Sequence, residues 1–340
     1  MRYRILGKSG LRVSELCLGT MTFGEDWGFG TGLDECKRMF SAFAERGGNF
    51  IDTANKYTEG SAERFVGELI AGQRERFVVA TKYTLNTAQR DPNAAGNHRK
   101  NMVQSVEASL RRLGTDYIDL YWVHAWDGTL HEEVLMRALD DLVRAGKVLH
   151  VGISDAPAWV VSRANTFAEL RGWSPFVGLQ IEYSLIERTV ERELVPMAHA
   201  LDVGVLAWAP IGGGVLTGKY TRGAPQDTLR AQANAERLSE RNVAIARAVD
   251  TIADELGRTS TQVALNWVRQ RRGNVIPIVG ARKASQLEDS LGCLDFELGA
   301  EHLARLDEVS AVALGFPHDF LARPRIQDIV LGDLRDRLVR

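Results

Sequence analysis

Short apolar runs alternate with longer amphipathic stretches along most of this chain. Apolar runs of about 4 to 8 residues are typical of strands that are buried on both faces, as in a parallel sheet. We therefore expect eight such strands, at Glu15–Leu18, Asn49–Asp52, Phe77–Thr81, Tyr117–Val123, Val148–Ile153, Val177–Ile181, Val203–Ala207 and Val275–Val279.

The stretches between these runs have the apolar spacing and the end signals of helices. Asp34 is a candidate N-cap, Pro157 suits a first helical turn, and Gly114 and Gly146 each follow the end of a predicted helix. The predicted helices are Asp34–Arg46, Ser61–Ala71, His98–Leu113, His131–Ala145, Pro157–Leu170, Thr189–Ala200, Arg241–Leu256 and Ala284–Leu291.

Eight strand–helix units in succession predict an α/β fold of the (β/α)8 TIM barrel type rather than a doubly wound open sheet. An open sheet of that kind carries a glycine fingerprint for phosphate directly after its first strand. Residues Gly28–Gly32 are rich in glycine but do not match that fingerprint, so we interpret them as a loop. Tyr3–Leu6 and Leu11–Ser14 flank a Gly-Lys-Ser-Gly turn and predict an N-terminal β-hairpin.

One domain is expected to span residues 1–340, because single barrels often reach this size. The polar segment Leu216–Glu240 predicts a long loop after strand 7, and loops of such length are often lids over a site. The tail from about Gly315 mixes basic and acidic residues without a clear period. We expect this tail to be irregular and to pack across the same end of the barrel.

The composition excludes several classes of protein. A net charge of −2 argues against nucleic-acid binding as the main activity, and no apolar run is long enough for a membrane span. Three widely spaced cysteines and the absence of a signal-peptide pattern favour a cytoplasmic protein. The seven histidines are scattered, so no metal site is expected, and the sequence leaves the oligomeric state open.

Four polar side chains lie just past three of the predicted strands. Asp52 and Tyr57 follow the second strand, Lys82 the third and His124 the fourth, so all four should meet at the C-terminal mouth of the barrel. A nearby ammonium lowers the pKa of a phenol, so Lys82, held by Asp52, could make Tyr57 a usable proton donor. His124 could donate a hydrogen bond to a substrate oxygen, which suits the protonation of a carbonyl.

Each of these residues also has a purely structural interpretation. Asp52 could cap its own loop, Tyr57 could be a loop aromatic, Lys82 a surface lysine and His124 a core histidine with satisfied hydrogen bonds. The four occurring together at strand ends favour the catalytic interpretation, because barrel enzymes place their chemistry there.

The segments around these four residues resemble the signature of the aldo-keto reductase superfamily. The matching stretches are Gly48–Tyr57, Ala80–Lys82 and Asp119–His124, and the similarity in order and spacing covers roughly residues 1 to 310. The resemblance implies a (β/α)8 barrel enzyme that reduces aldehydes or ketones to alcohols with a nicotinamide cofactor, usually NADPH (NADP+). It also implies a catalytic tetrad of Asp52, Tyr57, Lys82 and His124, with the proton coming from Tyr57.

A nicotinamide would be expected beside this tetrad. Ser154, Asp155 and Gln180 can hydrogen-bond a carboxamide, and the ring of Tyr183 can stack on a nicotinamide. The family usually has asparagine where this chain has Asp155, and an ionised aspartate accepts hydrogen bonds without donating any. Asp155 could instead cap the helix that begins near Pro157.

The phosphate end is predicted in the loops after the seventh and eighth strands, where barrels often bind phosphate. Glycine backbones can approach a pyrophosphate closely, and Arg282 is the candidate for the 2′-phosphate because a guanidinium binds phosphate bidentately. Arg282 and Lys283 could also be solvated charges at a helix start. The further predicted cofactor residues are Gly19, Thr20, Met21, Trp208, Ala209, Pro210, Ile211, Gly212, Gly214, Leu216, Gly218, Lys219, Gly280, Lys283, Gln286, Asp289 and Ser290.

The substrate, a small carbonyl compound, is expected beside His124. Trp27, Trp126 and Met21 lie in loops that leave the first and fourth strands, and they could form an apolar wall there. Ordinary loop or core packing explains them equally well, so the sequence leaves the natural carbonyl open.

Two other functions fit parts of the pattern. An NADPH-binding regulatory subunit with little turnover is one, because the β-subunits of voltage-gated potassium channels share the resemblance. A Schiff-base aldolase, which also uses a lysine at a strand end, is the other, although it would not need the phosphate-binding segments.

Overall fold

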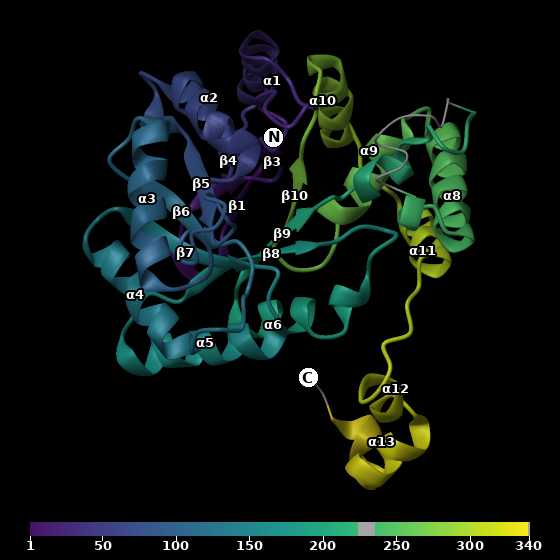
Figure 1. Ribbon diagram of the computed structural model, residues 1–340. Helices are drawn as coiled ribbons and strands as arrows, with labels where there is room; N and C mark the ends of the chain where they lie inside the picture. The colour runs from purple at the N-terminus through teal and green to yellow at the C-terminus, as the bar shows by residue number, and fades with distance from the viewer. Residues whose placement is uncertain (224–234, 339–340) are drawn as a thin grey trace.

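A closed parallel barrel forms the body of the protein in this computed structural model, which describes residues 1–223 and 235–338 (Figure 1). Each strand pairs with the next in chain order, and β10 closes the ring against β3, which confirms the (β/α)8 prediction. The barrel strands are β3 (Cys17–Gly19), β4 (Phe50–Asp52), β5 (Val78–Tyr83), β6 (Ile118–Val123), β7 (Val148–Ser154), β8 (Phe176–Glu182), β9 (Gly204–Trp208) and β10 (Val275–Val279).

The register of the strands brings their C-terminal ends to one rim. Asp52, the last residue of β4, is level with Ala80 of β5, and Lys82 is level with Trp122 of β6. The prediction that Lys82 follows its strand was wrong, because β5 continues through Tyr83. The physical reason is that Lys82 and Tyr83 still have partners on β6.

Helices surround the barrel, one or two after each strand (Figure 1). The predicted helix Thr189–Ala200 is divided into a short 3-10 turn, η4 (Thr189–Glu191), and α6, and the sequence reading missed α9 and α11. The helices are α1 (Leu33–Glu45), α2 (Ser61–Ile70), α3 (Arg99–Leu113), α4 (Glu132–Arg144), α5 (Ala158–Arg171), α6 (Leu194–Leu201), α8 (Glu240–Leu256), α9 (Ser260–Arg269), α10 (Ala284–Leu291) and α11 (Ala300–Val309).

The predicted N-terminal hairpin is present and covers the opposite end of the barrel from the rim. Its strands β1 (Tyr3–Ile5) and β2 (Arg12–Ser14) pair in antiparallel fashion. Leu6 and Val13 pack in one buried cluster with Phe50, which begins β4. The hairpin therefore closes the N-terminal end of the barrel with apolar side chains.

The barrel interior is filled by side chains, with Trp122 the largest of those that are fully buried. A Cβ at Gly152 would lie 2.4 Å from the Trp122 ring, and one at Gly178 would lie 2.7 Å from it. Glycines on β7 and β8 are therefore needed to make room for the indole. This packed floor fixes the strands that carry the polar residues at the rim.

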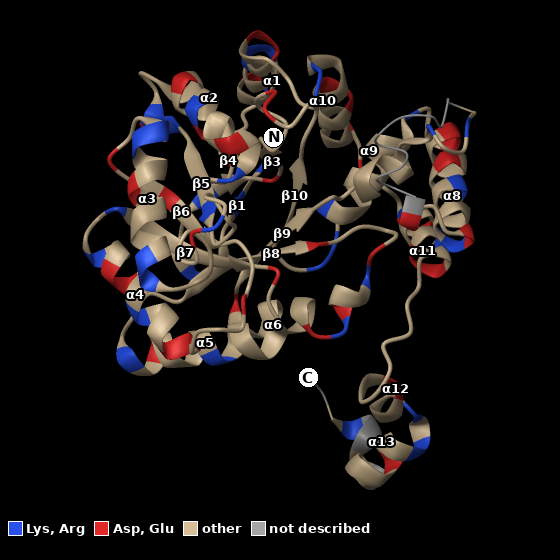
Figure 2. Cartoon of the chain, viewed as in Figure 1, with Lys and Arg blue, Asp and Glu red and all other residues tan. Residues whose placement is uncertain are grey.

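Most charged residues belong to the outer helices and loops, whereas the strands carry few of them (Figure 2). Acidic and basic residues are interspersed along α3, α4 and α8. Such mixing keeps the surface solvated without a large patch of one sign.

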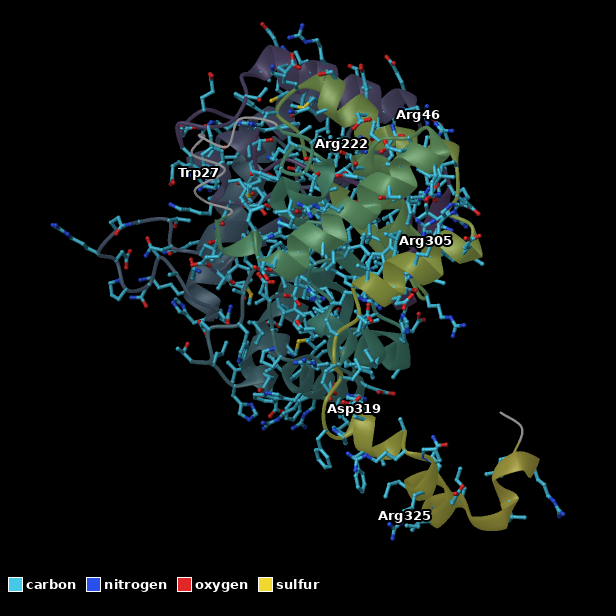
Figure 3. The ribbon with its side chains drawn as sticks, turned by 90° about the vertical axis from the view of Figure 1, so that its right-hand side faces the viewer. Trp27, Arg46, Arg222, Arg305, Asp319 and Arg325 are labelled. Atoms are coloured by element: carbon cyan, nitrogen blue, oxygen red, sulfur yellow. The ribbon has the colours of Figure 1, made fainter. Side chains whose placement is uncertain are left out.

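The two irregular segments of the prediction have different outcomes. Of the long loop Leu216–Glu240, residues 224–234 lie outside the described part of the chain, so a lid is not tested. The tail was expected to be irregular and to pack over the barrel, but it forms α12 (His318–Leu321) and α13 (Pro324–Leu331), which extend away from the barrel (Figures 1 and 3). Contacts such as His318 with Glu193 tie its start to the residues just before α6.

Candidate active site

Lys82 lies at the centre of the predicted tetrad and is completely buried. Its Nζ donates to Oδ2 of Asp52 at 2.5 Å, to the carbonyl oxygen of Thr53 at 2.9 Å and to Oη of Tyr57 at 2.9 Å. An ammonium has three protons, so these contacts use all of its donors. The structure thus brings Asp52, Lys82 and Tyr57 together as the sequence predicted.

The contact with Tyr57 has a defined direction. Because an ammonium can only donate, Oη of Tyr57 is the acceptor, and the phenol keeps its own O–H for another partner. Tyr57 begins the 3-10 turn η2 (Tyr57–Gly60), where Thr58 and Glu59 have positive φ angles of 45° and 51°. This sharp turn holds the phenol over the end of β5.

Burial and charge act in opposite senses on these groups. Burial alone would lower the pKa of Lys82, but the carboxylate of Asp52 and the oxygen of Tyr57 raise that pKa above its ordinary value. Burial raises the pKa of Tyr57, and the positive charge of Lys82 opposes this increase without cancelling it. Lys82 therefore acts on the pKa of Tyr57 in the direction that the sequence predicted, but burial has the larger effect on that pKa.

His124 lies edge-on to Tyr57, with ring centroids 5.8 Å apart and an angle of 83° between the rings. Burial and the nearby charge of Lys82 lower the pKa of His124 to about 2. Its imidazole is therefore neutral at physiological pH and carries one N–H proton. All four residues of the predicted tetrad lie at the same mouth.

Aromatic rings continue outward from Tyr57. Trp27 lies edge-on to Tyr57 with a centroid distance of 6.4 Å, and Phe29 lies 5.8 Å from Trp27. Phe29 is 46% exposed, as is the predicted residue Met21. Phe29 was missed by the sequence reasoning, although an aromatic residue two positions from Trp27 was a usable signal.

The predicted pocket residue Trp126 also lies at this rim and packs partly against the core. Its backbone N–H donates to the carbonyl oxygen of Asp155, 3.3 Å away. Trp126 is thereby tied to the loop after β7. The labelled side chain of Trp27 can be located in Figure 3.

The loop after β7 presents the next predicted group. Ser154 ends β7 and is buried, whereas Asp155 is exposed and adopts a positive φ of 45°, a conformation that Asp and Asn tolerate better than most residues. Oδ1 of Asp155 accepts a hydrogen bond from the indole of Trp208, 3.1 Å away. Asp155 therefore orients the half-buried Trp208 ring at the end of β9.

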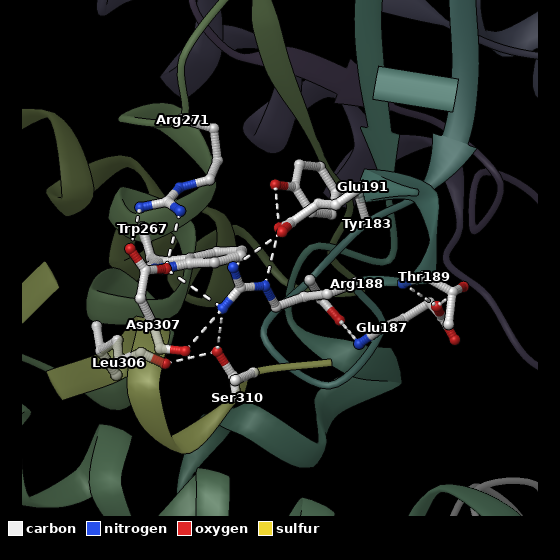
Figure 4. A network of polar contacts seen from close by, with 12 residues as sticks. Tyr183, Glu187, Arg188, Thr189, Glu191, Trp267, Arg271, Leu306, Asp307 and Ser310 are labelled. Carbon is white, nitrogen blue, oxygen red and sulfur yellow. Dashed lines mark hydrogen bonds and ion pairs between the residues drawn. The ribbon is translucent and has the colours of Figure 1, made fainter. Parts of the chain in front are cut away.

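Tyr183, predicted to stack on a nicotinamide, points elsewhere. Its ring is only 2% exposed and lies edge-on to Trp267 of α9, and its hydroxyl donates to Glu191 at 2.7 Å. Glu191 also accepts from Arg188, which contacts Asp307 and Ser310 (Figure 4). This network joins the barrel to α9 and α11, so the geometry does not support the stacking role.

The glycine-rich loop after β9 has the backbone that a phosphate cradle needs. Gly212, Gly213, Gly214 and Gly218 all have positive φ angles, which favour glycine over every other residue. A Cβ at Gly214 would lie 2.9 Å from Nζ of Lys219, so the lysine ammonium lies close against this loop. Four other predicted residues, Ala209, Pro210, Ile211 and Leu216, form the start of the same loop and its packing.

The loop after β10 is fastened to the loop after β3. Thr22 donates to the carbonyl oxygen of Ala281 at 2.6 Å, and Thr31 donates to that of Arg282 at 2.7 Å. Gly19 ends β3, and Thr20 next to it donates to the carbonyl oxygen of Asp52. The loop that carries Trp27 and Phe29 is thus anchored at both the tetrad and the predicted phosphate end.

Arg282 and Lys283 remain exposed beside α10. Within residues 1–223 and 235–338, neither side chain forms an ion pair, although the charge of Lys283 helps to lower the pKa of Glu35. The first backbone N–H of α10 is not available to a phosphate, because the N–H of Ala284 donates to the carboxylate of Glu35 at 2.6 Å. A phosphate at this end would therefore be held by the two basic side chains rather than by that N–H.

Three of the further predicted cofactor residues lie along α10. Gln286 accepts from the backbone N–H of Arg282 at 3.1 Å, and Ser290 donates back to the carbonyl oxygen of Gln286. Asp289 accepts hydrogen bonds from Gln262 and Thr259 of the neighbouring helix. Gly280 precedes this segment and is exposed. The positive-φ glycines, the free cations and the aromatic ring of Trp208 together fit an anionic dinucleotide.

Other kinds of site find less support. Over residues 1–223 and 235–338, no group of His, Cys, Asp and Glu side chains is arranged to hold a metal ion. His131 is the N-cap of α4, and its side chain accepts a hydrogen bond from the backbone N–H of Glu133. In the same residues, no helix is both long enough and apolar enough to cross a membrane.

Comparisons with known proteins agree with this geometry. The family model described as "Aldo/keto reductase family" matches residues 15–311. A norsolorinic acid reductase of Aspergillus flavus is 38% identical over 94% of this chain and 84% of its own length. An aryl-alcohol dehydrogenase of Pestalotiopsis microspora is 37% identical, covering 94% and 85%. An aryl-alcohol dehydrogenase (NADP(+)) of Phanerodontia chrysosporium is 36% identical, covering 91% and 86%.

The family model extends over most of the barrel, and the relatives match nearly the whole chain. The buried Asp52–Lys82 pair, the phenol of Tyr57 and the neutral His124 occupy one rim of a parallel barrel. On these findings the chain belongs to the aldo/keto reductase family of NAD(P)H-dependent oxidoreductases.

Proposed function

We propose that the protein reduces an aldehyde or ketone to an alcohol with NADPH, and that Tyr57 supplies the proton. The observation that carries this proposal is the hydrogen bond from Nζ of Lys82 to Oη of Tyr57. It leaves the O–H of Tyr57 as a donor at the mouth of the barrel, and it places a positive charge beside the phenolate that proton transfer would create.

The other tetrad residues support this transfer. Asp52 keeps Lys82 charged and in place, and Lys82 stabilises the negative charge on Tyr57 after its proton has moved to the carbonyl oxygen. Neutral His124 donates one hydrogen bond to the same oxygen, which stabilises charge as it develops there. The contacts of Lys82 do not favour a Schiff base, because a nucleophilic lysine must lose its charge.

A bound NADPH would supply the hydride for the carbonyl carbon. Trp208, Asp155, Ser154 and Gln180 are the groups proposed for its nicotinamide end, with Trp208 replacing Tyr183 as the ring that faces it. The exposed Arg282 and Lys283 support a preference for the 2′-phosphate of NADPH over NADH. One relative, named aryl-alcohol dehydrogenase (NADP(+)), supports the same choice.

The proposed substrate is an aryl aldehyde or ketone. Trp27, Phe29 and Tyr57 form a row of rings that leads outward from the proton donor, and offset or edge-on contacts with such rings favour a planar aromatic group. The relatives named aryl-alcohol dehydrogenase and norsolorinic acid reductase support this choice of class.

Replacement of Tyr57 by phenylalanine tests the proposal. Tyr57→Phe removes the acid while keeping the ring, so kcat for benzaldehyde reduction should fall about 10²- to 10⁴-fold. Its affinity for NADPH, measured by fluorescence titration, should match that of wild type. Tyr3→Phe is the matched control, because Tyr3 lies on the distant hairpin and donates only to Gly47.

Two results would contradict the proposal. Undiminished turnover by Tyr57→Phe would exclude Tyr57 as the proton donor. Tight NADPH binding by wild type without turnover of a broad panel of aldehydes and ketones would favour a regulatory subunit instead.

A further inference from the structure

Thr84 directly follows β5 and has a backbone conformation that is costly for its residue type. Its φ angle is 109°, and its side chain is buried. A β-branched residue at positive φ is a real outlier and persists only where the surroundings require it. At this position Oγ1 of Thr84 accepts hydrogen bonds from the backbone N–H of His124, 3.2 Å away, and from Nδ2 of Asn97, 3.0 Å away.

Asn97 connects the loop after β5 to the loop after β6 and is completely buried. Its Nδ2 also donates to the carbonyl oxygen of Ala125 at 2.9 Å, and its Oδ1 accepts from the N–H of Asp127 at 2.9 Å. The N–H of Asn97 in turn donates to Oδ2 of Asp127 at 2.7 Å. One amide side chain therefore holds the backbone on both sides of Trp126.

His124 depends on this backbone for its orientation. Its Nδ1 is buried and has no hydrogen-bond partner within residues 1–223 and 235–338. A catalytic histidine is usually oriented by a group bonded to its second nitrogen, and His124 lacks that support. Two contacts then set the position of the ring. The backbone N–H of His124 donates to Oγ1 of Thr84 and to the carbonyl oxygen of Tyr83, and the imidazole lies edge-on to Tyr57.

We propose that Thr84 and Asn97 are positioning residues that hold His124, and with it Trp126, in place for carbonyl reduction. They act as one unit with Asp127, which we call the Thr84–Asn97–Asp127 clamp. The strained backbone of Thr84 is the cost of presenting its hydroxyl to His124. This inference rests on the proposed reductase function, because it assigns the clamp its effect through His124.

Activity measurements test the clamp in the full-length enzyme. Asn97→Ala removes three side-chain hydrogen bonds, and the resulting displacement of His124 should lower kcat for benzaldehyde about 10- to 100-fold. The affinity for NADPH should be unchanged. Asn93→Ala is the matched control, because Asn93 is an exposed asparagine in the same loop whose backbone, not its amide, bonds Asp91.

A double-mutant cycle separates positioning from general stability. If Asn97 acts through His124, Asn97→Ala should cost little further activity in a His124→Ala background. If Asn97→Ala only weakened the fold, its fold-loss in kcat would be the same in the His124→Ala background as in wild type, and the two losses would multiply. Should Asn97→Ala fail to fold, Thr84→Val takes its place, because it keeps the shape of Thr84 without the hydroxyl, and Thr84→Ser should restore most of the rate that Thr84→Val loses.

Hydrogen exchange gives a readout that needs no turnover. The amides of His124 and Asp127 donate into the clamp, so a peptide covering residues 124–129 should exchange faster in Asn97→Ala and Thr84→Val. A peptide from the hairpin at residues 3–14 should not change. Normal hydrogen exchange together with normal kcat in these variants would overturn the clamp. If the variants exchange faster but the wild-type protein itself reduces no carbonyl compound, the clamp stands and the reductase proposal has failed instead.

Discussion

Gln180 donates a hydrogen bond from Nε2 to Oδ1 of Asp52, 3.0 Å away, across the interior of the barrel. The two residues belong to β8 and β4, which lie four strands apart in the ring of eight and so face one another. Lys82 binds the other oxygen of Asp52, so the carboxylate is held from two directions. The amide of Gln180, which the sequence predicted for the cofactor, is therefore partly committed to the Asp52–Lys82 pair.

The buried pair of Asp52 and Lys82 should show strong coupling in stability. Lys82→Met leaves the carboxylate of Asp52 buried without its counter-ion, which should lower the free energy of unfolding by about 3–5 kcal/mol. The double variant Asp52→Asn with Lys82→Met removes both charges and should recover much of that loss. Urea denaturation followed by circular dichroism measures both values. Equal stability of the single and double variants would contradict the pairing seen here.

The pH dependence of kcat/KM should lack a histidine step. Burial and Lys82 lower the pKa of His124 to about 2, so this residue stays neutral across the pH range of the assay. Tyr57 must be protonated to act, and burial raises its pKa above the ordinary value of about 10. Activity should therefore be lost only in strongly alkaline solution, as the pH rises toward this raised pKa. Initial rates of benzaldehyde reduction should be level from about pH 6 to 9. A loss of activity centred at about pH 6.5 would instead indicate a titrating histidine.

The choice between cofactors should depend on Arg282 and Lys283. Arg282→Ala removes a cation that no described residue neutralises, so NADPH affinity should fall about 10-fold or more while NADH affinity is unaffected. Fluorescence titration with each cofactor measures the ratio. Arg325→Ala is the control, because Arg325 is exposed on α13 of the tail, which lies far from α10 (Figures 1 and 3). Equal affinity of wild type for NADH and NADPH would argue against the 2′-phosphate assignment.

Substrate preference should depend on the exposed ring of Phe29. Phe29→Leu keeps an apolar side chain but loses the aromatic face beside Trp27, so kcat/KM for benzaldehyde should fall about 3- to 10-fold relative to butanal. Trp27 is a poorer first target because its indole also donates to Glu59. Phe316→Leu, on the exposed tail, should leave the ratio of the two substrates unchanged. An equal loss of kcat/KM for benzaldehyde and butanal would indicate that Phe29→Leu disrupts the loop in general and does not act on aryl recognition.

The architecture and the tetrad could be read from local pattern. Short apolar runs separated by amphipathic stretches specify buried strands and covering helices, and eight such units close into a barrel whose strand ends share one rim. Because Asp52, Tyr57 and His124 lie at or just past these strand ends, their convergence followed from chain order alone. The end of β5 was misplaced because its limit depends on pairing with β6, which is a contact between distant segments.

Tertiary structure alone decided where side chains point. Tyr183 and Trp208 both lie near strand ends, but Tyr183 turns toward Trp267 and Glu191 in the helix layer, whereas Trp208 is drawn to Asp155 at the mouth. The crossing bond from Gln180 to Asp52 and the hold of Asn97 on the His124 loop also join residues far apart in the chain. A sequence records which residues follow a strand, whereas their partners depend on packing between elements that meet only when the barrel closes.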